Sequence, residues 1–287
     1  MRRREGRTGP QLNWARQDLE QRLLFNGGRY TRVNGLLSGL IGILLAVIFY
    51  AVLAMTPLAK TAVGQIFLER GPTQHAVVVL FFWSLAILVF KRSKLGLQRQ
   101  ALDVKVLPDE AGFVISPSTV DQVLKRIHEI AADPRNFMVL NRVEVALSNL
   151  RNLGRVGDVE ELLRAQASQD ESQVETSYAL IQGFVWAIPV LGFIGTVLGL
   201  SQAIGSFTAV LGTGEDVSAI TGALGNVTAG LATAFDTTLV ALVAALIIQL
   251  LMVMTKKSEE EFLDESMEYG MQNIVGRLRL ESPGEEA

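Results

Sequence analysis

The sequence predicts an all-α membrane protein with four transmembrane helices, a helical cytoplasmic domain between spans 2 and 3, and a cytoplasmic C-terminal helix. Three observations lead to this fold class. The mean hydropathy is +0.32 and only 19% of the residues are charged, which favours a membrane protein over a soluble globule. Four segments are apolar enough to be candidates for crossing a bilayer. Between and after these segments, apolar residues recur at helical spacing.

Residues 1–35 are predicted to form a basic N-terminal arm. Apolar residues such as Trp14 and Leu19 stand among arginines, which fits a short helix lying at the membrane surface with basic side chains toward anionic headgroups. The same pattern fits a cytoplasmic helix packed on the helical domain, and both interpretations stay open. The arginines of the arm are Arg2, Arg3, Arg4, Arg7, Arg16, Arg22, Arg29 and Arg32.

The first two spans are predicted over residues 36–55 and 76–90, with residues 56–75 as the periplasmic loop between them. The first span carries no charge over roughly the 20 residues that a membrane-spanning helix requires. The second is shorter but dense in Val, Leu and Phe. It is closed by Lys91 and Arg92, whose long side chains can extend toward the polar boundary.

Residues 91–180 are too polar for the bilayer and are predicted to form the cytoplasmic helical domain. A first helix is expected where Val120, Val123 and Ile127 follow one another at helical spacing. A second helix is expected over residues 137–153. A third is expected to begin near Asp158 and to continue without interruption into span 3.

Spans 3 and 4 are predicted over residues 181–203 and 230–254. Residues 204–229 between them are predicted to form a periplasmic-side loop and the start of a long helix. Asp236 is the only charged residue within either span. After span 4, residues 255–287 continue an amphipathic stripe, which predicts a cytoplasmic C-terminal helix and a frayed tail.

The lysines and arginines determine the expected orientation. They are dense in the N-terminal arm, after span 2 and after span 4. The only basic residues of the loop 56–75 are Lys60 and Arg70. The only charged residues of the loop between spans 3 and 4 are the acidic Glu215 and Asp216. The positive-inside rule therefore places both termini and the helical domain in the cytoplasm, N-in and C-in.

Composition excludes several classes of function. The chain has no cysteine and only two histidines, His75 and His128, so neither a thiol nucleophile nor a Cys- or His-rich metal site is expected. The net charge of -3 does not favour nucleic-acid binding. The glycine-rich segments lie inside predicted spans and form no phosphate loop or nucleophile elbow. We therefore expect no enzyme activity, no metal and no cofactor.

Span 3 is crowded with small residues, and two interpretations of them compete. Gly192 and Thr196 form one i,i+4 pair, and Gly195 and Gly199 form another. Close helix–helix packing alone explains such a pattern. A wall of a pore is the alternative. Pro189 removes one backbone hydrogen bond, which predicts a kink or a hinge in the span.

Span 4 carries a threonine stripe with one carboxylate. Thr233, Asp236 and Thr237 stand at positions i, i+3 and i+4, so they are expected to share one face, which Gly230 extends. A carboxylate within a span is a functional-site candidate. The structural alternative is that the threonine hydroxyls bond carbonyls of their own helix, with Asp236 near the interface on the outer side.

These two stretches carry a resemblance. The pattern Gly192-Phe193-Ile194-Gly195-Thr196-Val197-Leu198-Gly199, followed by Ala232-Thr233-Ala234 on the next span, is similar to that of the MotA/TolQ/ExbB proton-channel family. The large cytoplasmic segment before span 3 and the amphipathic helix after span 4 match the family layout. Four spans resemble MotA more than the three-span TolQ and ExbB.

The resemblance implies a homopentamer in the bacterial inner membrane around two copies of a single-span MotB/TolR/ExbD-like partner, which carries the essential membrane aspartate. Thr196 and Thr233 match the family's pore-facing threonines, and ion flow would drive rotation of the pentamer. Asp236 departs from the small or apolar residue expected at this position. We therefore take Thr196, Thr233, Thr237 and Asp236 as ion-pathway candidates.

Three alternatives remain at this point. The transported ion is expected to be H+, but threonine hydroxyls and carbonyls can also ligate Na+. A membrane scaffold or adaptor would use the same threonines for packing alone. A secondary transporter is less consistent, because the four spans show no internal repeat.

Overall fold

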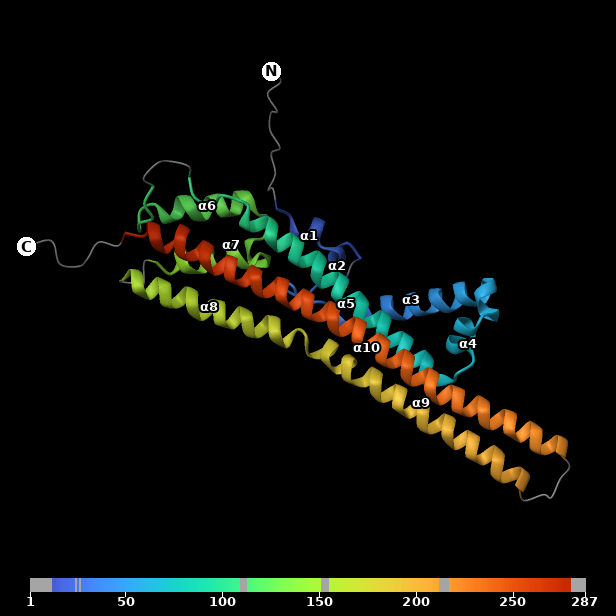
Figure 1. Ribbon diagram of the computed structural model, residues 1–287. Coiled ribbons are helices and arrows are strands. Elements are labelled where there is room, and N and C mark those ends of the chain that lie inside the picture. Colours follow the sequence, from blue (N-terminus) through green and yellow to red (C-terminus); the bar gives the residue numbers. More distant parts are fainter. Residues whose placement is uncertain are drawn as a thin grey trace, which may run out of the picture. The chain divides into compact units, whose positions relative to one another are not determined.

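The computed structural model describes residues 12–23, 25, 27–108, 113–150, 155–211 and 217–279. These residues form an all-helical fold (Figure 1). The arginines at the start of the N-terminal arm, the acidic pair Glu215 and Asp216, and the tail 280–287 lie outside the described residues. The chain divides into two compact units. We name Gly35–Val89 with Tyr178–Met254 the span unit, and Met1–Asn34 with Phe90–Ser177 and Thr255–Ala287 the helical unit.

Four helices are long and apolar enough to cross a membrane, and they correspond to the four predicted spans. Each of these four helices extends beyond at least one end of its predicted span. The reason is that capping or turn residues end a helix, whereas the start of a polar segment does not. The elements that contribute to the span unit are α3 (Gly35–Met55), η1 (Pro57–Lys60), α4 (Ala62–Leu68), α5 (Pro72–Leu102), α9 (Ala179–Leu211) and α10 (Val217–Asn273).

Local residues explain where the second span begins. Gly71 has φ +89, a left-handed conformation that glycine adopts at low cost. Pro72 then occupies the first helical position of α5, where its missing N–H leaves no intrahelical bond unmade. Further along α5, Trp83 packs against α3, where the Cβ of any larger residue at Gly42 would lie 2.5 Å from the Trp83 backbone.

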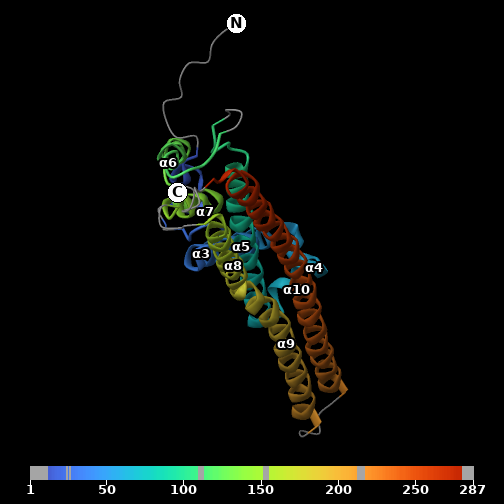
Figure 2. The same ribbon diagram turned by 90° about the vertical axis from the view of Figure 1, so that its left-hand side faces the viewer.

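The helical unit has one continuous hydrophobic core. In α6 (Val120–Ile130) the residues Val120, Val123 and Ile127 are at most 2% exposed, which confirms the face predicted from their spacing. This helix packs on α7 (Met138–Ser148), as both views show (Figures 1 and 2). The remaining elements of the unit are α1 (Trp14–Gln17), α2 (Leu19–Arg22), η2 (Pro134–Asn136), α8 (Val156–Thr176), η3 (Val275–Arg277) and the ends of α5 and α10.

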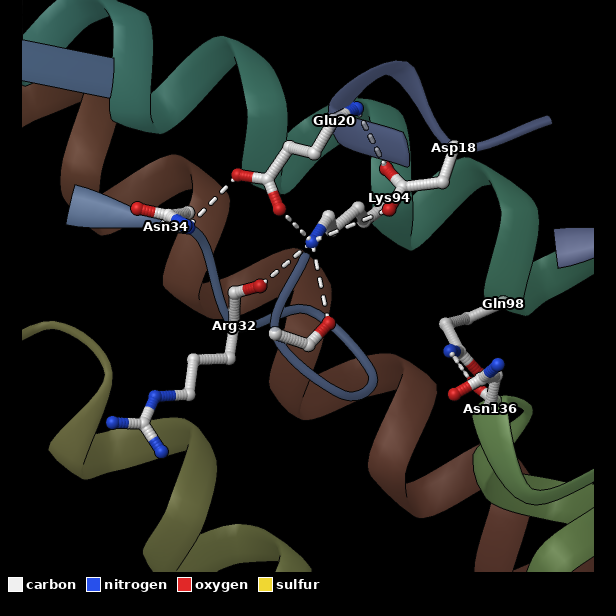
Figure 3. A network of polar contacts seen from close by, with 8 residues as sticks. Asp18, Glu20, Arg32, Asn34, Lys94, Gln98 and Asn136 are labelled. Carbon is white, nitrogen blue, oxygen red and sulfur yellow. Dashed lines mark hydrogen bonds and ion pairs between the residues drawn. The ribbon is translucent and has the colours of Figure 1, made fainter. Parts of the chain in front are cut away.

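The described part of the N-terminal arm packs on the rest of the helical unit. The Trp14 ring is 2% exposed and meets Phe137 edge to face, with 5.5 Å between ring centroids. Figure 3 shows that Lys94 of α5 joins the arm through buried polar contacts. Its ammonium donates to Glu20 Oε2 at 2.5 Å and to the Arg32 carbonyl at 2.8 Å. For α1 and α2, the structure therefore shows the packing that the second interpretation expects.

A second buried contact in Figure 3 fixes the start of α7. The Gln98 side chain is fully buried, donates to the Asn136 carbonyl at 2.7 Å and accepts from the Met138 N–H at 2.9 Å. An amide of this kind satisfies one of the donors that the first turn of a helix leaves open. α5 thus positions both the arm and α7.

The structure corrects one prediction about helix boundaries. The third helix of the domain does not run without interruption into span 3, because α8 ends at Thr176 and α9 begins at Ala179. The Ser177 N–H turns back to the carbonyls of Gln173 and Val174, each at 3.1 Å. Tyr178, which follows in the turn, is fully buried. No glycine or proline stands at the break, so the sequence pattern did not reveal it.

Candidate functional site

Helices α9 and α10 run side by side and are in backbone contact at glycines (Figures 1 and 2). A Cβ placed on Gly199 would lie 2.6 Å from the Gly230 carbonyl oxygen, and one on Gly230 would lie 2.7 Å from the Gly199 carbonyl oxygen. A Cβ on Gly192 would lie 2.5 Å from the Ala241 Cβ. Real Cβ atoms do not approach other heavy atoms this closely, so these three positions accept only glycine without a shift of the helices. The predicted small-residue packing therefore occurs within one chain.

Pro189 lies inside α9, and the helix continues on both sides of it. The proline has no N–H, so the carbonyl one turn earlier receives no bond from it. Gly192 and Gly199, the two contact glycines of α9 named above, both follow this position.

Thr196 connects α9 to α10 through hydrogen bonds. Its hydroxyl is in hydrogen-bond contact with the hydroxyl of Thr238 and lies 3.0 Å from the Ala234 carbonyl of α10. The Thr238 hydroxyl in turn lies 3.1 Å from the Gly192 carbonyl of α9. Each hydroxyl has one proton to donate and accepts as well.

These contacts allow two complete hydrogen-bond arrangements. In one, Thr196 donates to Thr238, and Thr238 donates to the Gly192 carbonyl. In the other, Thr238 donates to Thr196, and Thr196 donates to the Ala234 carbonyl. Both satisfy every hydroxyl proton, so the pair reverses its direction without leaving a donor unpaired. This is the property that a hydroxyl relay for protons needs.

Thr237 faces the interior of the span unit. It is 1% exposed, and its hydroxyl donates to carbonyls of its own helix, at 2.9 Å to Thr233 and 3.2 Å to Ala234. A Cβ on Gly195 would lie 2.6 Å from the Thr237 Oγ1 and 3.0 Å from the Thr73 Oγ1 of α5. Gly195 therefore makes room for two hydroxyls, and three helices meet at this point.

Asp236 is in an ion pair with an arginine from the loop before α5. The Arg70 Nη2 lies 2.9 Å from Asp236 Oδ2, and the Arg70 Nη1 donates to the Thr233 hydroxyl at 3.4 Å. The two charged side chains are 19% and 24% exposed. Pairing of this kind is how charges within a span are usually compensated. The Thr233 hydroxyl also donates to the Ala229 carbonyl of its own helix at 3.0 Å.

The structure thus separates residues that the spacing placed together. Thr233 and Asp236 share a face and both contact Arg70, whereas Thr237 turns toward α9. Thr196 is joined to Thr238 and the Ala234 carbonyl, and the hydroxyl of Thr233 has other partners. The intrahelical bonds expected from the structural alternative are also present.

Three residues of the site were missed from the sequence: Arg70, Thr73 and Thr238. Thr238 stands at the end of the threonine stretch, so its proximity to the other threonines was a usable signal. In the sequence, Arg70 stood out only as one of two bases in its loop. A lone arginine just before an apolar span is nevertheless a natural partner for a lone intramembrane aspartate. Thr73 gave no local signal.

Next to Thr73, Gln74 of α5 is fully buried, and neither its Nε2 nor its Oε1 has a hydrogen-bond partner in the structure. A buried amide without partners is costly in a low-dielectric interior. Among the described residues, no group of three or more His, Cys, Asp or Glu side chains gathers as a metal site would require. The polar groups described at this contact are thus the threonine hydroxyls, the Gln74 amide and the Arg70–Asp236 ion pair.

Comparisons with known proteins agree with the resemblance seen in the sequence. No curated protein and no solved structure matched the chain. A sequence model of the MotA/TolQ/ExbB proton channel family matches residues 139–269, from α7 to the C-terminal part of α10. This range contains every glycine and threonine of the α9–α10 contact described above. With its four apolar helices, the chain is a multi-pass membrane protein whose residues 139–269 are similar in sequence to the MotA/TolQ/ExbB proton channel family.

Proposed function

We propose that this chain is the proton-conducting subunit of an inner-membrane ion-driven rotary motor. It would assemble as a homopentamer around two copies of a single-span partner with a membrane aspartate, and it would convert the proton motive force into mechanical work. The family match supports an ion-channel subunit of motor type. The pentameric assembly, the single-span partner and the location in the inner membrane are proposed by analogy with the family.

The observation that carries this proposal is the reversible hydroxyl pair of Thr196 and Thr238 at a glycine-lined helix contact. Proton transfer needs groups that both donate and accept hydrogen bonds, and it does not need a set of ligands that surrounds the ion. The partner's aspartate would exchange protons with water and these hydroxyls as the pentamer turns. Thr233, one turn before Thr237 on α10, would act from the neighbouring position.

The ion pair of Asp236 supports protons over sodium as the transported ion. The Arg70 guanidinium lies 2.9 Å from Asp236 and compensates its charge. A neutral pair attracts Na+ less than an unpaired carboxylate would. Asp236 then acts as a positioning residue for Thr233, and the partner supplies the titrating carboxylate.

The distribution of charges supports an N-in, C-in orientation in the cytoplasmic membrane. Arg29 and Arg32 stand just before α3, and Lys256 and Lys257 follow span 4. The loop between α3 and α5 contains only Lys60 and Arg70 as bases, and Arg70 is paired. By the positive-inside rule this loop faces the periplasm.

The test is proton flux in liposomes that contain the chain and its cognate single-span partner. Thr196→Ala and Thr233→Ala each remove a hydroxyl, and losing one hydrogen bond of ~1 kcal/mol predicts a loss of flux of about tenfold or less. Thr228→Ala is the matched control, because that exposed hydroxyl bonds only the Leu224 carbonyl of its own helix. Unchanged flux in both test variants would contradict the channel function and favour a scaffold subunit. Flux that follows a Na+ gradient would contradict the choice of ion.

A further inference from the structure

The helical unit contains a cavity of about 230 Å³ that the proposed function does not use. Two stretches of chain line it, residues 29–32 after α2 and residues 172–177 at the end of α8, and the structure describes both without a gap. The volume is below the roughly 300–1,000 Å³ of sites that enclose a whole small molecule. The cavity therefore suits the polar head of a larger molecule.

A strained turn brings two arginines together at this cavity. Arg29 and Arg32 are the first and last residues of a β-turn, which the Arg32 N–H closes by donating to the Arg29 carbonyl at 3.2 Å. Tyr30, the second residue of the turn, has φ +58, a left-handed conformation that glycine usually supplies. A bulky residue keeps such a conformation only where its surroundings hold it. Here Tyr30 is 4% exposed, and its hydroxyl accepts from the Asn141 amide at 3.0 Å.

The Arg29 guanidinium is held by the protein itself. Its Nε donates to the Arg135 carbonyl at 2.9 Å, and its Nη2 donates to the Asn141 Oδ1 at 2.7 Å. The guanidinium carbon also lies 4.8 Å from the centroid of the Tyr30 ring. The Arg32 side chain is exposed, and Figure 3 shows it extending away from the buried lysine contact. Arg29 is thus fixed in place, and Arg32 can adjust to a ligand.

The two arginines are the charged residues of the described lining, which contains no carboxylate. The Asp170 carboxylate lies just before this stretch of α8 and is paired with Arg142 at 2.7 Å. Burial raises the pKa of the Asp170 carboxyl, and Arg142 and then Arg29 oppose the shift, so Asp170 compensates Arg29 in part. Arg32 takes part in no ion pair with a described residue. The lining therefore carries the charge of Arg32 and part of the charge of Arg29.

Both stretches of the lining lead directly into membrane-spanning helices. Arg32 stands three positions before Gly35, where α3 begins, and Ser177 stands two positions before Ala179, where α9 begins. Because consecutive Cα atoms are 3.8 Å apart, these chain segments reach at most ~11 Å and ~8 Å. The cavity therefore lies close to the ends of two spans, where the headgroup region of a bilayer begins.

We propose that this cavity binds the phosphate headgroup of an anionic membrane lipid. A guanidinium group presents a planar fork of N–H donors that matches phosphate oxygens, and basic pockets beside spans suit lipid headgroups. The small volume favours a lipid over a soluble phosphate compound, because the acyl chains of a lipid stay outside the cavity. The proposal does not depend on ion conduction. It rests on the proposed orientation only for the leaflet, which would be the cytoplasmic one.

The test is native mass spectrometry of the full chain from neutral-detergent micelles that contain equal amounts of phosphatidylglycerol and phosphatidylcholine. The wild type should retain phosphatidylglycerol in preference, and less of it as the salt concentration is raised. The Arg29→Gln/Arg32→Gln double variant should bind phosphatidylglycerol at least about tenfold more weakly, since each arginine supplies charge-assisted hydrogen bonds. The Lys256→Gln/Lys257→Gln double variant is the control, because it removes the same charge just after span 4, outside the described lining.

Loss of phosphatidylglycerol in the double arginine variant alone supports the site. Unchanged retention in that variant, equal loss in both double variants, or no lipid preference of the wild type would overturn it, because the attraction would then be a general effect of charge at the membrane. Displacement of the lipid by an equal concentration of glycerol 1-phosphate would overturn the choice of a lipid.

Unfolding midpoints check that the variants fold. If the double arginine variant is unstable, Arg32→Gln alone decides the question. The Arg32 side chain makes no described hydrogen bond or ion pair, so this single variant should keep the stability of the wild type and still bind phosphatidylglycerol more weakly. Unchanged binding by Arg32→Gln would then overturn the proposal.

Discussion

The Gly199→Ala substitution tests the central feature of the span unit, the backbone contact between α9 and α10. The added Cβ would lie 2.6 Å from the Gly230 carbonyl oxygen and 2.9 Å from the Ala234 nitrogen. Both are backbone atoms, so neither can swing aside like the end of a side chain. The helices must separate, which also strains the contact of Thr196 with Thr238.

The expected magnitude follows from two opposing effects. Overpacking of this kind costs ~3 kcal/mol, and replacing glycine by alanine within a helix returns ~1 kcal/mol. The free energy of unfolding should therefore fall by ~2 kcal/mol. Gly183→Ala on the same helix is the matched control, because nothing lies within 4 Å of its added Cβ. That variant should be as stable as the wild type or up to ~1 kcal/mol more stable.

The assay is equilibrium unfolding in mixed micelles, with the denaturing detergent raised stepwise and the helix content followed by circular dichroism. The two alanine variants should differ by ~3 kcal/mol, which is the sum of the loss at Gly199 and the gain at Gly183. Equal stability of the two variants would refute the argument, because α9 and α10 would then not be in backbone contact at Gly199.

Two further predictions concern charges. A double-mutant cycle of Arg70→Gln and Asp236→Asn should give a coupling energy of ~1–3 kcal/mol, between the values for exposed and buried pairs, with Glu69→Gln in the same loop as the control. Unfolding in micelles measures it, and a coupling near zero would mean that the pair contributes nothing. Burial raises the pKa of the Asp18 carboxyl above its ordinary value near 3.8, although Lys94 opposes the shift. The folded arm therefore binds a proton at Asp18 more tightly than the unfolded arm. The stability that this proton adds to the folded arm is present below pH 3.8 and is lost as pH rises through the raised pKa. Asp18→Asn should remove this part of the pH dependence, measured by amide hydrogen exchange in α1 and α2. Exposed Asp103→Asn should retain it, and an unchanged pH profile in Asp18→Asn would contradict the assignment.

Much of the fold was predictable from local sequence. Apolar runs of membrane-spanning length identified all four long helices, because length and hydropathy are properties of a segment by itself. The apolar face of α6 followed from its period. The small residues of span 3 predicted close packing, and the structure has a backbone contact at Gly199 and a close approach of Gly192 to the Ala241 Cβ.

The pairing of residues at the site was less predictable. Spacing placed Thr233 and Asp236 on one face, but it did not identify Arg70, 163 residues from Thr233, as their partner. Spacing also did not join Thr196 to Thr238 across 42 residues. Such pairs depend on the rotation of each helix about its axis and on its register against the neighbour, which the period of one helix does not determine.

The sequence by itself predicted a helical membrane protein with four spans and a glycine and threonine pattern similar to that of the MotA/TolQ/ExbB family. The tertiary structure alone decided that Asp236 is neutralised by Arg70, that Thr196 and Thr238 form a reversible hydroxyl pair, and that the arm is held by Lys94. The physical reason is that hydropathy and periodicity act within a segment. A charge or a hydroxyl acquires its role only from the partner that packing brings within hydrogen-bond distance.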